Sequence, residues 1–531
     1  MKKRVIALAA GLAVLAGGLA VRVGVLTRGE LASAADRQAS YTVTVARCRG
    51  TIYDTRLTPL VNTGSEYRIS AAPTPQVAAA LATQLEGEDK QTALQELAAG
   101  HPVALAMDHP PNTVEGIYAF RVPVRYASPL MAEHLVGYLD GDGLHGAVGA
   151  EALFDERLSE YTGEVRVTYT LDGSGGLLEG VPPRIENTLS RAAGGVALTL
   201  DSRVQAIALR AAKRYLPRGA AVIGEAATGR ILASVSTPGF QPDTLAQALE
   251  DDDSPLLNRV ACNYNCGSVF KIVTAAAALE NGLTPGVTFS CDGSIREEGI
   301  TFHCHNPLGH GRLDMTGGFS NSCNPYFIRL ARRTGGRALY DMAAALGFGQ
   351  ALTLEGGWET ARSILPAPAT LSGAALANLS IGQGDLLASP LHIAAMVGAV
   401  VNDGRWRPPS LLKGLVDEKG QLEETALPTE KTVFSAATAA RLREMMIQTV
   451  QTGTGRSAAP AAGGAGAKTG TAQTGWKRDA GSAEVVQSWI AGFYPAEKPR
   501  YVVVTMAEDA ENTGGSSADA FRQICEQLAS L

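Results

Sequence analysis

Three short motifs with reactive side chains follow one another in the second half of the chain. They are Ser268-Val269-Phe270-Lys271, Ser322-Cys323-Asn324 and Lys468-Thr469-Gly470-Thr471. In the first motif, a helix would bring the Lys271 amine to the Ser268 hydroxyl, because residues i and i+3 share a helix face. Serine is a weak nucleophile until a neighbouring base removes its proton, and lysine can be that base only if its pKa falls from about 10.4. The first motif therefore predicts a serine nucleophile with a lysine base.

Each motif alone is weak. The S-x-x-K pattern recurs at Ser410–Lys413, where two prolines precede it and favour an extended segment. Taken singly, Ser268 suits a helix cap, Ser322–Asn324 suits a polar loop, and Lys468–Gly470 suits a strand entered from a Gly/Ala-rich loop. S-x-N and K-T-G each occur once, however, and both lie downstream of Ser268. That order is the one expected of serine enzymes that react with penicillin.

The elements that would position these motifs are predicted by apolar periodicity. Gly267 precedes Ser268 and the apolar run Ile272–Leu279 follows it, so Ser268 is predicted to open a helix. The same patterns predict a strand at Val196–Leu200, a helix at Val204–Tyr215, a hairpin of Ala220–Gly224 with Ile231–Val235, and strands at Trp489–Tyr494 and Tyr501–Met506. Together they indicate an α+β domain that covers residues 196–531.

Residues 28–195 are predicted to form a second, smaller domain. Short β-like runs such as Tyr41–Val45 and Val165–Thr170 alternate with Gly/Pro turns, and a helical stretch covers about Gln76–Ala99. The segment 172–184 is rich in turn residues and is predicted to be a loop. No internal repeat is visible in the sequence.

The first residues indicate the compartment. Basic residues at Lys2–Arg4 precede an apolar stretch, Val5–Val21, which continues for a few residues past Arg22. This length is enough for one membrane span if Arg22 reaches the interface. We expect residues 1–27 to be a cytoplasmic start and transmembrane anchor, with the rest of the chain outside the cytoplasm. The alternative is a signal peptide cleaved after Ala32-Ser33-Ala34, a site far beyond the apolar stretch.

Composition excludes some classes of function. The 531 residues carry a net charge of -6 and contain no run of Lys and Arg beyond Lys2–Arg4, which argues against nucleic-acid binding. Hydrophobic residues make up 45% of the chain and charged residues 18%, as in folded proteins and unlike disordered ones.

The seven cysteines leave two questions open. Seven is an odd number, so at least one thiol is free or pairs with another chain. Cys291 and Cys304 are candidates for a disulfide in an oxidising compartment. A zinc site is the alternative, because three histidines lie close to Cys304 in sequence, namely His303, His305 and His310. No C-x2-C spacing occurs and the segment is rich in Gly, Asn and Pro, so we predict no metal ligands here.

With these motifs in view, the chain resembles a class B penicillin-binding protein, a monofunctional D,D-transpeptidase of peptidoglycan. Further matching segments are Arg49–Asp54, Ala221–Pro242, Asn258-Arg259, Tyr264, Ser380–Gly384, Ser389–Leu391, Trp489, Gly492-Phe493 and Pro495. The resemblance implies an α+β transpeptidase domain of the penicillin-binding and serine-β-lactamase-like type, with an antiparallel sheet flanked by helices. It also implies an elongated N-terminal pedestal at 28–195 and a single N-terminal membrane anchor.

Two positions depart from the family pattern. Cys266 stands where the family usually has proline before Gly-Ser, and Thr55-Arg56-Leu57 replaces the usual Arg-Asn-Gly after the pedestal motif. Residues 28–195 also lack the His-x-Gly signature of a glycosyltransferase, so that the Glu-Asp pair at 88–89 stands without it, which argues against a bifunctional class A enzyme.

The resemblance implies a cross-linking reaction through an acyl-enzyme. Ser268 would attack the D-Ala-D-Ala carbonyl of a stem peptide, with Lys271 as the base. Ser322 would relay a proton to the departing amine, and Asn324 would hold Lys271 and the substrate amide. The oxyanion hole would consist of the backbone N–H groups of Ser268 and Thr471.

The third motif would bind the peptide. Lys468 would supply positive charge near the substrate carboxylate, and the hydroxyls of Thr469 and Thr471 would hydrogen-bond it. Gly470 would let the strand backbone lie flat against the peptide. Two tryptophans, Trp476 and Trp489, flank this strand. We expect both to pack in the core; the alternative is that they form a wall of the substrate site.

The resemblance also implies partners. The chain would act on peptidoglycan stem peptides, be acylated by β-lactam antibiotics, and need no metal or organic cofactor. Its pedestal and anchor would contact a polytopic membrane glycan polymerase, which is an analogy with the family.

Three other functions share parts of this pattern. A β-lactamase would need a dedicated group to activate water. A β-lactam sensor would normally carry further membrane spans and a protease motif such as H-E-x-x-H, which is absent. An inactive scaffold within a cell-wall complex would not need the three motifs intact.

Overall fold

The computed structural model describes residues 2–26, 40–127, 129–172, 176–178, 180–477 and 484–531. Two compact units alternate along the sequence. The smaller comprises Met1–Gly50, Asn62–Ala127 and Glu160–Ala193, and the larger comprises Thr51–Val61, Ser128–Ser159 and Gly194–Leu531. The last change between units falls close to the predicted boundary at residue 195, and the roles assigned to 28–195 and 196–531 stay predictions.

The N-terminal helix α1 spans Lys2–Leu26. Its residues Lys2–Val25 are long and apolar enough to cross a membrane, judged by length and composition. This is compatible with a single-pass membrane anchor. The alternative cleavage site at Ala32-Ser33-Ala34 lies outside the described residues.

The smaller unit contains two three-stranded sheets and a helix pair. One sheet has the order β1-β6-β7, formed by Ser40–Cys48, Gly163–Thr170 and Arg184–Asn187; the other has the order β4-β3-β5, formed by Val103–Met107, Gly64–Ala71 and Ile117–Val124. The predicted helical stretch at 76–99 is two helices, α3 (Pro75–Gln84) and α4 (Gly87–Ala98). They are separate because Leu85 and Glu86 are extended and Gly87 adopts a positive φ of 66°.

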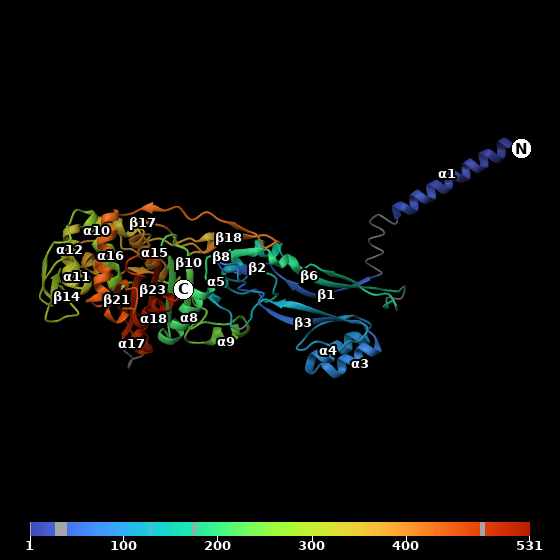
Figure 1. Cartoon of the computed structure of the whole chain (residues 1–531), viewed down its shortest axis with the longest axis horizontal. Helices are drawn as coiled ribbons and strands as arrows, with labels where there is room; N and C mark the ends of the chain where they lie inside the picture. Colours follow the sequence, from blue (N-terminus) through green and yellow to red (C-terminus); the bar gives the residue numbers. More distant parts are fainter. Residues whose placement is uncertain (1, 27–39, 128, 173–175, 179, 478–483) are drawn as a thin grey trace. The chain divides into compact units, whose positions relative to one another are not determined.

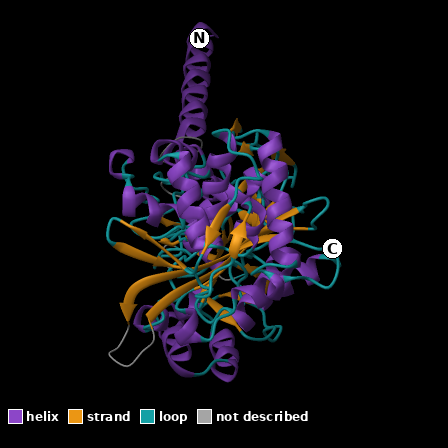
Figure 2. Cartoon of the chain, turned by 90° about the vertical axis from the view of Figure 1, so that its left-hand side faces the viewer, coloured by secondary structure: helices purple, strands orange, loops and turns teal. Residues whose placement is uncertain are grey.

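A five-stranded antiparallel sheet is the centre of the larger unit. Its order is β10-β9-β23-β22-β21, formed by Ile231–Thr237, Gly219–Glu225, Tyr501–Ala507, Glu484–Tyr494 and Gly466–Lys477. The predicted hairpin and the predicted C-terminal strands all belong to this sheet. Figure 2 shows the strands enclosed by helices. The antiparallel sheet flanked by helices is therefore confirmed.

Side-chain alternation along the strands separates the two faces of this sheet. Ala221 and Ile223 pack in a core cluster with helices α8 (Ser202–Tyr215) and α18 (Ser517–Leu528). Val222 lies on the opposite face beside Leu391 of α15 (Pro390–Val401). Burying both faces of a sheet beneath helices stabilises it through the apolar area removed from water.

The larger unit contains further helices, and some of them lie beside the motif segments. The further helices are α5 (Glu133–Val136), α6 (Gly149–Leu153), α7 (Asp155–Glu160), α9 (Leu245–Glu250), α10 (Lys271–Glu280), α11 (Met315–Ser320), α12 (Asn324–Thr334), α13 (Gly336–Ala345), α14 (Gly373–Ser380), α16 (Ala436–Gln451) and α17 (Ala510–Thr513). Figure 1 labels α10, α11, α12 and α16 near β21, the edge strand of the large sheet. Contacts of α16 with β21, α10 and α11 agree with this arrangement.

Small sheets complete the larger unit. A four-stranded sheet has the order β19-β18-β8-β2, formed by Leu422–Glu424, Leu412–Val416, Gly195–Leu198 and Thr51–Tyr53. Two-stranded pairs are β11 (Tyr264–Asn265) with β16 (Leu387–Ala388), β12 (Phe289–Cys291) with β15 (Gly311–Leu313), β13 (Ser294–Glu297) with β14 (Ile300–His303), and β17 (Arg405–Trp406) with β20 (Lys431–Thr432).

Candidate active site

Ser268 lies in a tight turn at the start of a helix. The 3-10 turn η3 (Gly267–Phe270) leads directly into α10, so the predicted helix start is confirmed. Gly267 adopts φ 57°, and a Cβ on it would lie only 2.7 Å from the carbonyl oxygen of Thr471. A Cβ on Gly382 would lie 1.9 Å from the Gly267 carbonyl oxygen. Two glycines therefore allow the serine turn to contact both the K-T-G-T strand and the G-Q-G segment.

The Lys271 amine is buried and held by the S-x-N loop. Its Nζ donates hydrogen bonds to the Ser322 carbonyl oxygen (2.6 Å), to Asn324 Oδ1 (2.6 Å) and to Ser322 Oγ (3.3 Å). The ring of Phe327 lies 5.5 Å from this Nζ. Asn324 also donates from Nδ2 to the His303 carbonyl oxygen (2.9 Å), which fixes its amide.

Ser322 sits between two lysines. Lys468 Nζ donates to Ser322 Oγ (2.9 Å) and to the Thr469 carbonyl oxygen (3.0 Å). Ser322 has φ 53°, a left-handed conformation that costs a non-glycine residue about 1–3 kcal/mol. Such a conformation persists only where the surroundings fix it. Lys271, Ser322 and Lys468, which are far apart in sequence, are thereby brought together by hydrogen bonds.

The K-T-G-T motif lies in the middle of the edge strand β21. Thr469 Oγ1 is hydrogen-bonded to Thr454 Oγ1 at 2.7 Å, and the Thr471 side chain is exposed. A Cβ on Gly470 would lie about 3 Å from Val269 and Trp489 side-chain atoms (3.0 and 3.2 Å). The glycine is therefore required by packing against the serine turn, a reason the sequence did not indicate.

One contact expected from the sequence is not formed. Among the described residues, the Ser268 hydroxyl has no hydrogen-bond partner, so Lys271 and Ser268 are near neighbours in sequence without a direct bond. Ser268 is half-buried. Catalytic hydrogen bonds are often long in a protein without substrate and tighten in the complex, so the serine remains a candidate nucleophile.

Burial changes the acidity of both lysines. It lowers the pKa of Lys271 from 10.5 to about 7. Burial, together with the charge of Lys271, holds the pKa of Lys468 well below 10.5. Within the described part of the chain, neither amine lies within 4.0 Å of a carboxylate. Lys271 can therefore lose its proton near neutral pH, as a general base must.

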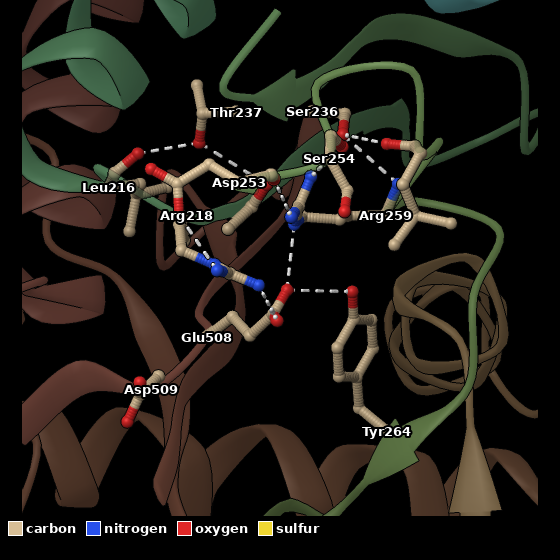
Figure 3. Close-up of polar contacts among 12 residues, drawn as sticks. Leu216, Arg218, Ser236, Thr237, Asp253, Ser254, Arg259, Tyr264, Glu508 and Asp509 are labelled. Atoms are coloured by element: carbon tan, nitrogen blue, oxygen red, sulfur yellow. Dashed lines mark hydrogen bonds and ion pairs between the residues drawn. The ribbon is translucent and has the colours of Figure 1, made fainter. Parts of the chain in front are cut away.

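A second buried charge cluster lies upstream of the serine (Figure 3). Arg259 has a fully buried side chain, and its Nε donates to Glu508 Oε2 at 2.7 Å. Arg218 donates to Glu508 Oε1 (2.8 Å), and Tyr264 OH donates to Oε2 (3.2 Å). The guanidinium of Arg259 also donates to two backbone carbonyls, of Asp253 and Ser254. These bonds fix the segment that leads into η3.

The structure brings together a different set of cysteines and histidines from the one that sequence spacing suggested. Cys291, Cys304, His310 and Cys323 form a group, whereas His303 and His305 are not part of it. All seven cysteines are described, and none of them forms a disulfide in this structure. Cys323 is fully buried.

The two tryptophans differ. Trp489 is fully buried and its indole N–H donates to the Asn265 carbonyl oxygen (3.0 Å), so the prediction of core packing is confirmed for it. Trp476 is 59% exposed, so that prediction is wrong for Trp476. It lies near the end of β21, where the strand extends beyond the core.

Sequence reasoning missed Thr454, Gly382 in its packing role, and Glu508. Thr454 lies in a turn whose backbone N–H donates to the Ser320 carbonyl oxygen (3.0 Å), which places it between two motifs. Its only signal is the sequence Thr452-Gly453-Thr454-Gly455, which resembles an ordinary turn.

Comparison with known proteins identifies the family of the chain. Residues 219–526 match the family model described as "Penicillin binding protein transpeptidase domain". The chain belongs to this family. The resemblance to class B penicillin-binding proteins is likewise confirmed: penicillin-binding protein PbpB of Mycolicibacterium smegmatis is 34% identical over 432 residues, which cover 76% of this chain and 64% of that protein.

Solved structures of family members have the same fold. Penicillin-binding protein 3 of Mycobacterium tuberculosis, in a structure with ampicillin, matches this chain with a TM-score of 0.66 at 27% identity. The match covers 92% of this chain and 96% of the M. tuberculosis chain. A chain from a peptidoglycan synthase complex has a TM-score of 0.71 and covers 99% of this chain and 98% of its own; at 24% identity it shows the fold alone. The chain spans less than two thirds of the length of the first curated relatives it matches.

Proposed function

We propose that this chain is a peptidoglycan D,D-transpeptidase that works through an acyl-enzyme on Ser268 and is inhibited by β-lactams. The observation that carries the proposal is the convergence of Lys271 and Lys468 on Ser322, beside the turn that presents Ser268. The relatives called peptidoglycan D,D-transpeptidase PbpA, 31–32% identical, support the same reaction class. The ampicillin complex of the M. tuberculosis relative supports β-lactam binding.

In the first half-reaction, Ser268 Oγ attacks the carbonyl carbon of the penultimate D-Ala, and its proton passes to the Lys271 amine. Backbone N–H groups of Ser268 and Thr471 stabilise the oxyanion. The C–N bond then breaks, and the departing D-Ala amine receives a proton through the Ser322 hydroxyl, which both lysines hold. The product is an ester between the stem peptide and Ser268.

In the second half-reaction, an amine from a neighbouring stem peptide attacks the ester. Its extra proton passes to the Lys271–Ser322 pair and on to Ser268 Oγ as the C–O bond breaks, so the Ser268 hydroxyl is regenerated and the cross-link is formed. Asn324 holds the substrate amide, and Lys468, Thr469 and Thr471 bind the terminal carboxylate. The peptide would add alongside β21, because β21 is an edge strand of the large sheet.

We further propose that α1 anchors the chain with its catalytic unit outside the cytoplasm, where peptidoglycan lies. The proposed partner is a polytopic membrane glycan polymerase that makes the glycan strands to be cross-linked. This partner and the pedestal role of residues 28–195 follow from the class B resemblance.

The test is acylation of the full-length chain in detergent by a fluorescent penicillin, with mapping of the adduct by mass spectrometry. We expect a stable adduct on the peptide containing Ser268, which Ser268→Ala abolishes. The chain offers a matched control, because Ser410→Ala alters the second S-x-x-K copy and should leave acylation unchanged. No adduct on folded protein would favour an inactive scaffold, and an adduct hydrolysed within seconds would favour a β-lactamase.

A further inference from the structure

Four side chains beside the S-x-N loop bring their metal-binding atoms together. They belong to Cys291, Cys304, His310 and Cys323, and all four ligand atoms lie within 4.8 Å of one another. The three cysteines are buried and His310 is half-buried. The His310 Nδ1 lies 3.4 Å from the Cys304 Sγ. None of these side chains has a role in the proposed acyl transfer.

The backbone holds three of these donors in place. Cys291 ends β12, and the N–H of His310, just before β15, donates to the Cys291 carbonyl oxygen (3.0 Å). The N–H of Cys304 donates to the Gly293 carbonyl oxygen (2.9 Å). A Cβ on Gly293 would lie 2.1 Å from the Pro307 carbonyl oxygen, so the loop carrying Cys304 and His310 closes tightly on β12.

The fourth donor comes from the active-site loop. Cys323 is the N-cap residue of α12, and its N–H donates to the Gly318 carbonyl oxygen (2.9 Å). The donors therefore come from separate segments that are already folded against one another.

We propose that this cluster binds one structural zinc ion through three cysteine sulfurs and one histidine nitrogen. Three thiolates with one imidazole is a donor set that zinc takes in closed tetrahedral sites. With Zn–S bonds of about 2.3 Å, the sulfurs of such a site lie roughly 3.8 Å apart. Atoms that already lie within 4.8 Å of one another need to move by about 1 Å or less to reach that geometry. Four protein ligands leave no open position for catalysis, so the metal is structural.

The consequence for the active site follows from the sequence position of Cys323. It lies between Ser322, which contacts both lysines, and Asn324, which contacts Lys271. Asn324 is also bound to the carbonyl of His303, next to the ligand Cys304. The zinc would tie the S-x-N loop to the β12–β15 segment and help to hold Ser322 in its left-handed conformation. This consequence, unlike the metal site itself, rests on the proposed function.

The first experiment measures metal in the full-length chain, purified in detergent with a thiol reductant and no chelator. We expect about one zinc per chain by elemental mass spectrometry, and at least a tenfold lower content in Cys291→Ser and in His310→Ala. The matched controls are Cys262→Ser and His303→Ala, which alter a cysteine and a histidine outside the cluster and should keep the metal. Cobalt in place of zinc should give sulfur-to-cobalt charge-transfer absorption that Cys291→Ser removes.

Three results would overturn the zinc site. They are wild-type chain that stays metal-free after dialysis against zinc, a zinc content unchanged by both ligand substitutions, or an intact mass two hydrogens low from a disulfide within the cluster of the native chain. The first and the last are measured on the wild-type chain, so they do not depend on whether a variant folds.

The second experiment tests the positioning role. Removing zinc with a chelator should lower the melting temperature of the wild type and slow penicillin acylation by about 10–100-fold, and added zinc should restore both. The Cys291→Ser chain should not respond to the chelator. Unchanged acylation in demonstrably zinc-free chain would overturn the positioning role. A chain that penicillin never acylates would instead contradict the proposed function, since zinc content and melting temperature report on the metal alone.

Discussion

Two of the clusters in which the larger unit buries charge, around Glu508 and around Ser322, differ in how the charges are paired. Around Glu508, every charged group has a partner: two arginines share one carboxylate, and a tyrosine and two backbone carbonyls complete the bonds (Figure 3). Around Ser322, two lysine amines are buried with hydroxyl, amide and carbonyl oxygens but without a carboxylate.

The difference in pairing determines the direction in which the pKa of the central group is shifted in each cluster. At Glu508, burial acts to raise the pKa of the carboxyl, but Arg259 and Arg218 overcome this and lower it, so both signs of charge persist. At Lys271, nothing opposes burial strongly enough, so the amine gives up its proton readily. A buried charge with an opposite charge beside it stays ionised and holds a fixed geometry. A buried amine without a counter-charge has a lowered pKa and can act as a base. Substitutions in the two clusters should therefore have different consequences.

The largest expected effect comes from removing the reactive amine. Lys271→Met should lower the rate of penicillin acylation by about 10²–10⁴-fold, because the base is lost. Its free energy of unfolding should change little, because removing a buried amine that lacks a counter-charge offsets the loss of its hydrogen bonds to Ser322 and Asn324. Stopped-flow acylation and urea unfolding would measure both. Lys413→Met, in the second S-x-x-K copy, is the control; unchanged acylation in Lys271→Met would remove lysine from the mechanism.

The paired cluster should respond differently. Glu508→Ala leaves the fully buried Arg259 without its counter-charge and should lower the free energy of unfolding by about 3–5 kcal/mol. Urea unfolding followed by tryptophan fluorescence would measure this. A loss below about 1 kcal/mol, the range of surface ion pairs, would contradict the assignment of a buried pair.

The same pair predicts a pH dependence. Since the pKa of Glu508 is below its unfolded value of 4.5, the ionised carboxylate contributes stability above pH 4.5, and this contribution is lost as the pH falls through the lower folded pKa. The stability difference between the wild type and Glu508→Gln should therefore be constant near neutral pH and shrink in acid. Urea midpoints at a series of pH values would show it, with Glu511→Gln, at an exposed position, as the control. A difference that grew in acid would reverse the sign we infer.

The smallest effect should come from the edge of the paired cluster. Tyr264→Phe removes one hydrogen bond to a carboxylate that keeps both arginines, and should cost about 1–2 kcal/mol. Acylation should be nearly unchanged, because Tyr264 does not touch either lysine. A large loss of acylation at preserved stability would mean that this cluster also positions the serine turn.

Much of this site could be predicted because its signals are local. The serine turn, the helix after it and the central strands are encoded in short runs of spaced residues, and the structure has them at the expected places. Glu508 could not be singled out, because its importance comes from Arg259, which lies far away in the sequence. The break between α3 and α4 was missed although the sequence offered a local signal for it, since residues 86–92 contain no apolar side chain and include Gly87.

The cysteine cluster illustrates the same limit. Sequence spacing grouped His303, His305 and His310 with Cys304, but of these histidines the fold keeps only His310 and adds Cys291 and Cys323 from other segments. Local spacing predicts a metal site only when one hairpin or loop supplies ligand pairs. Here each segment supplies one or two ligands, and no short pattern connects them.

Strand β2 has a practical consequence for protein production. It comes from Thr51–Tyr53, yet it pairs in parallel with β8, and Asp54 directly after it accepts hydrogen bonds from the hydroxyl and N–H of Ser202 at the start of α8. A truncated chain that began at residue 196 would lose both contacts and expose the free edge of β8 to other molecules. Preparations made for inhibitor screening should therefore begin upstream of Thr51, since a shorter chain would be prone to self-association even with every motif residue intact.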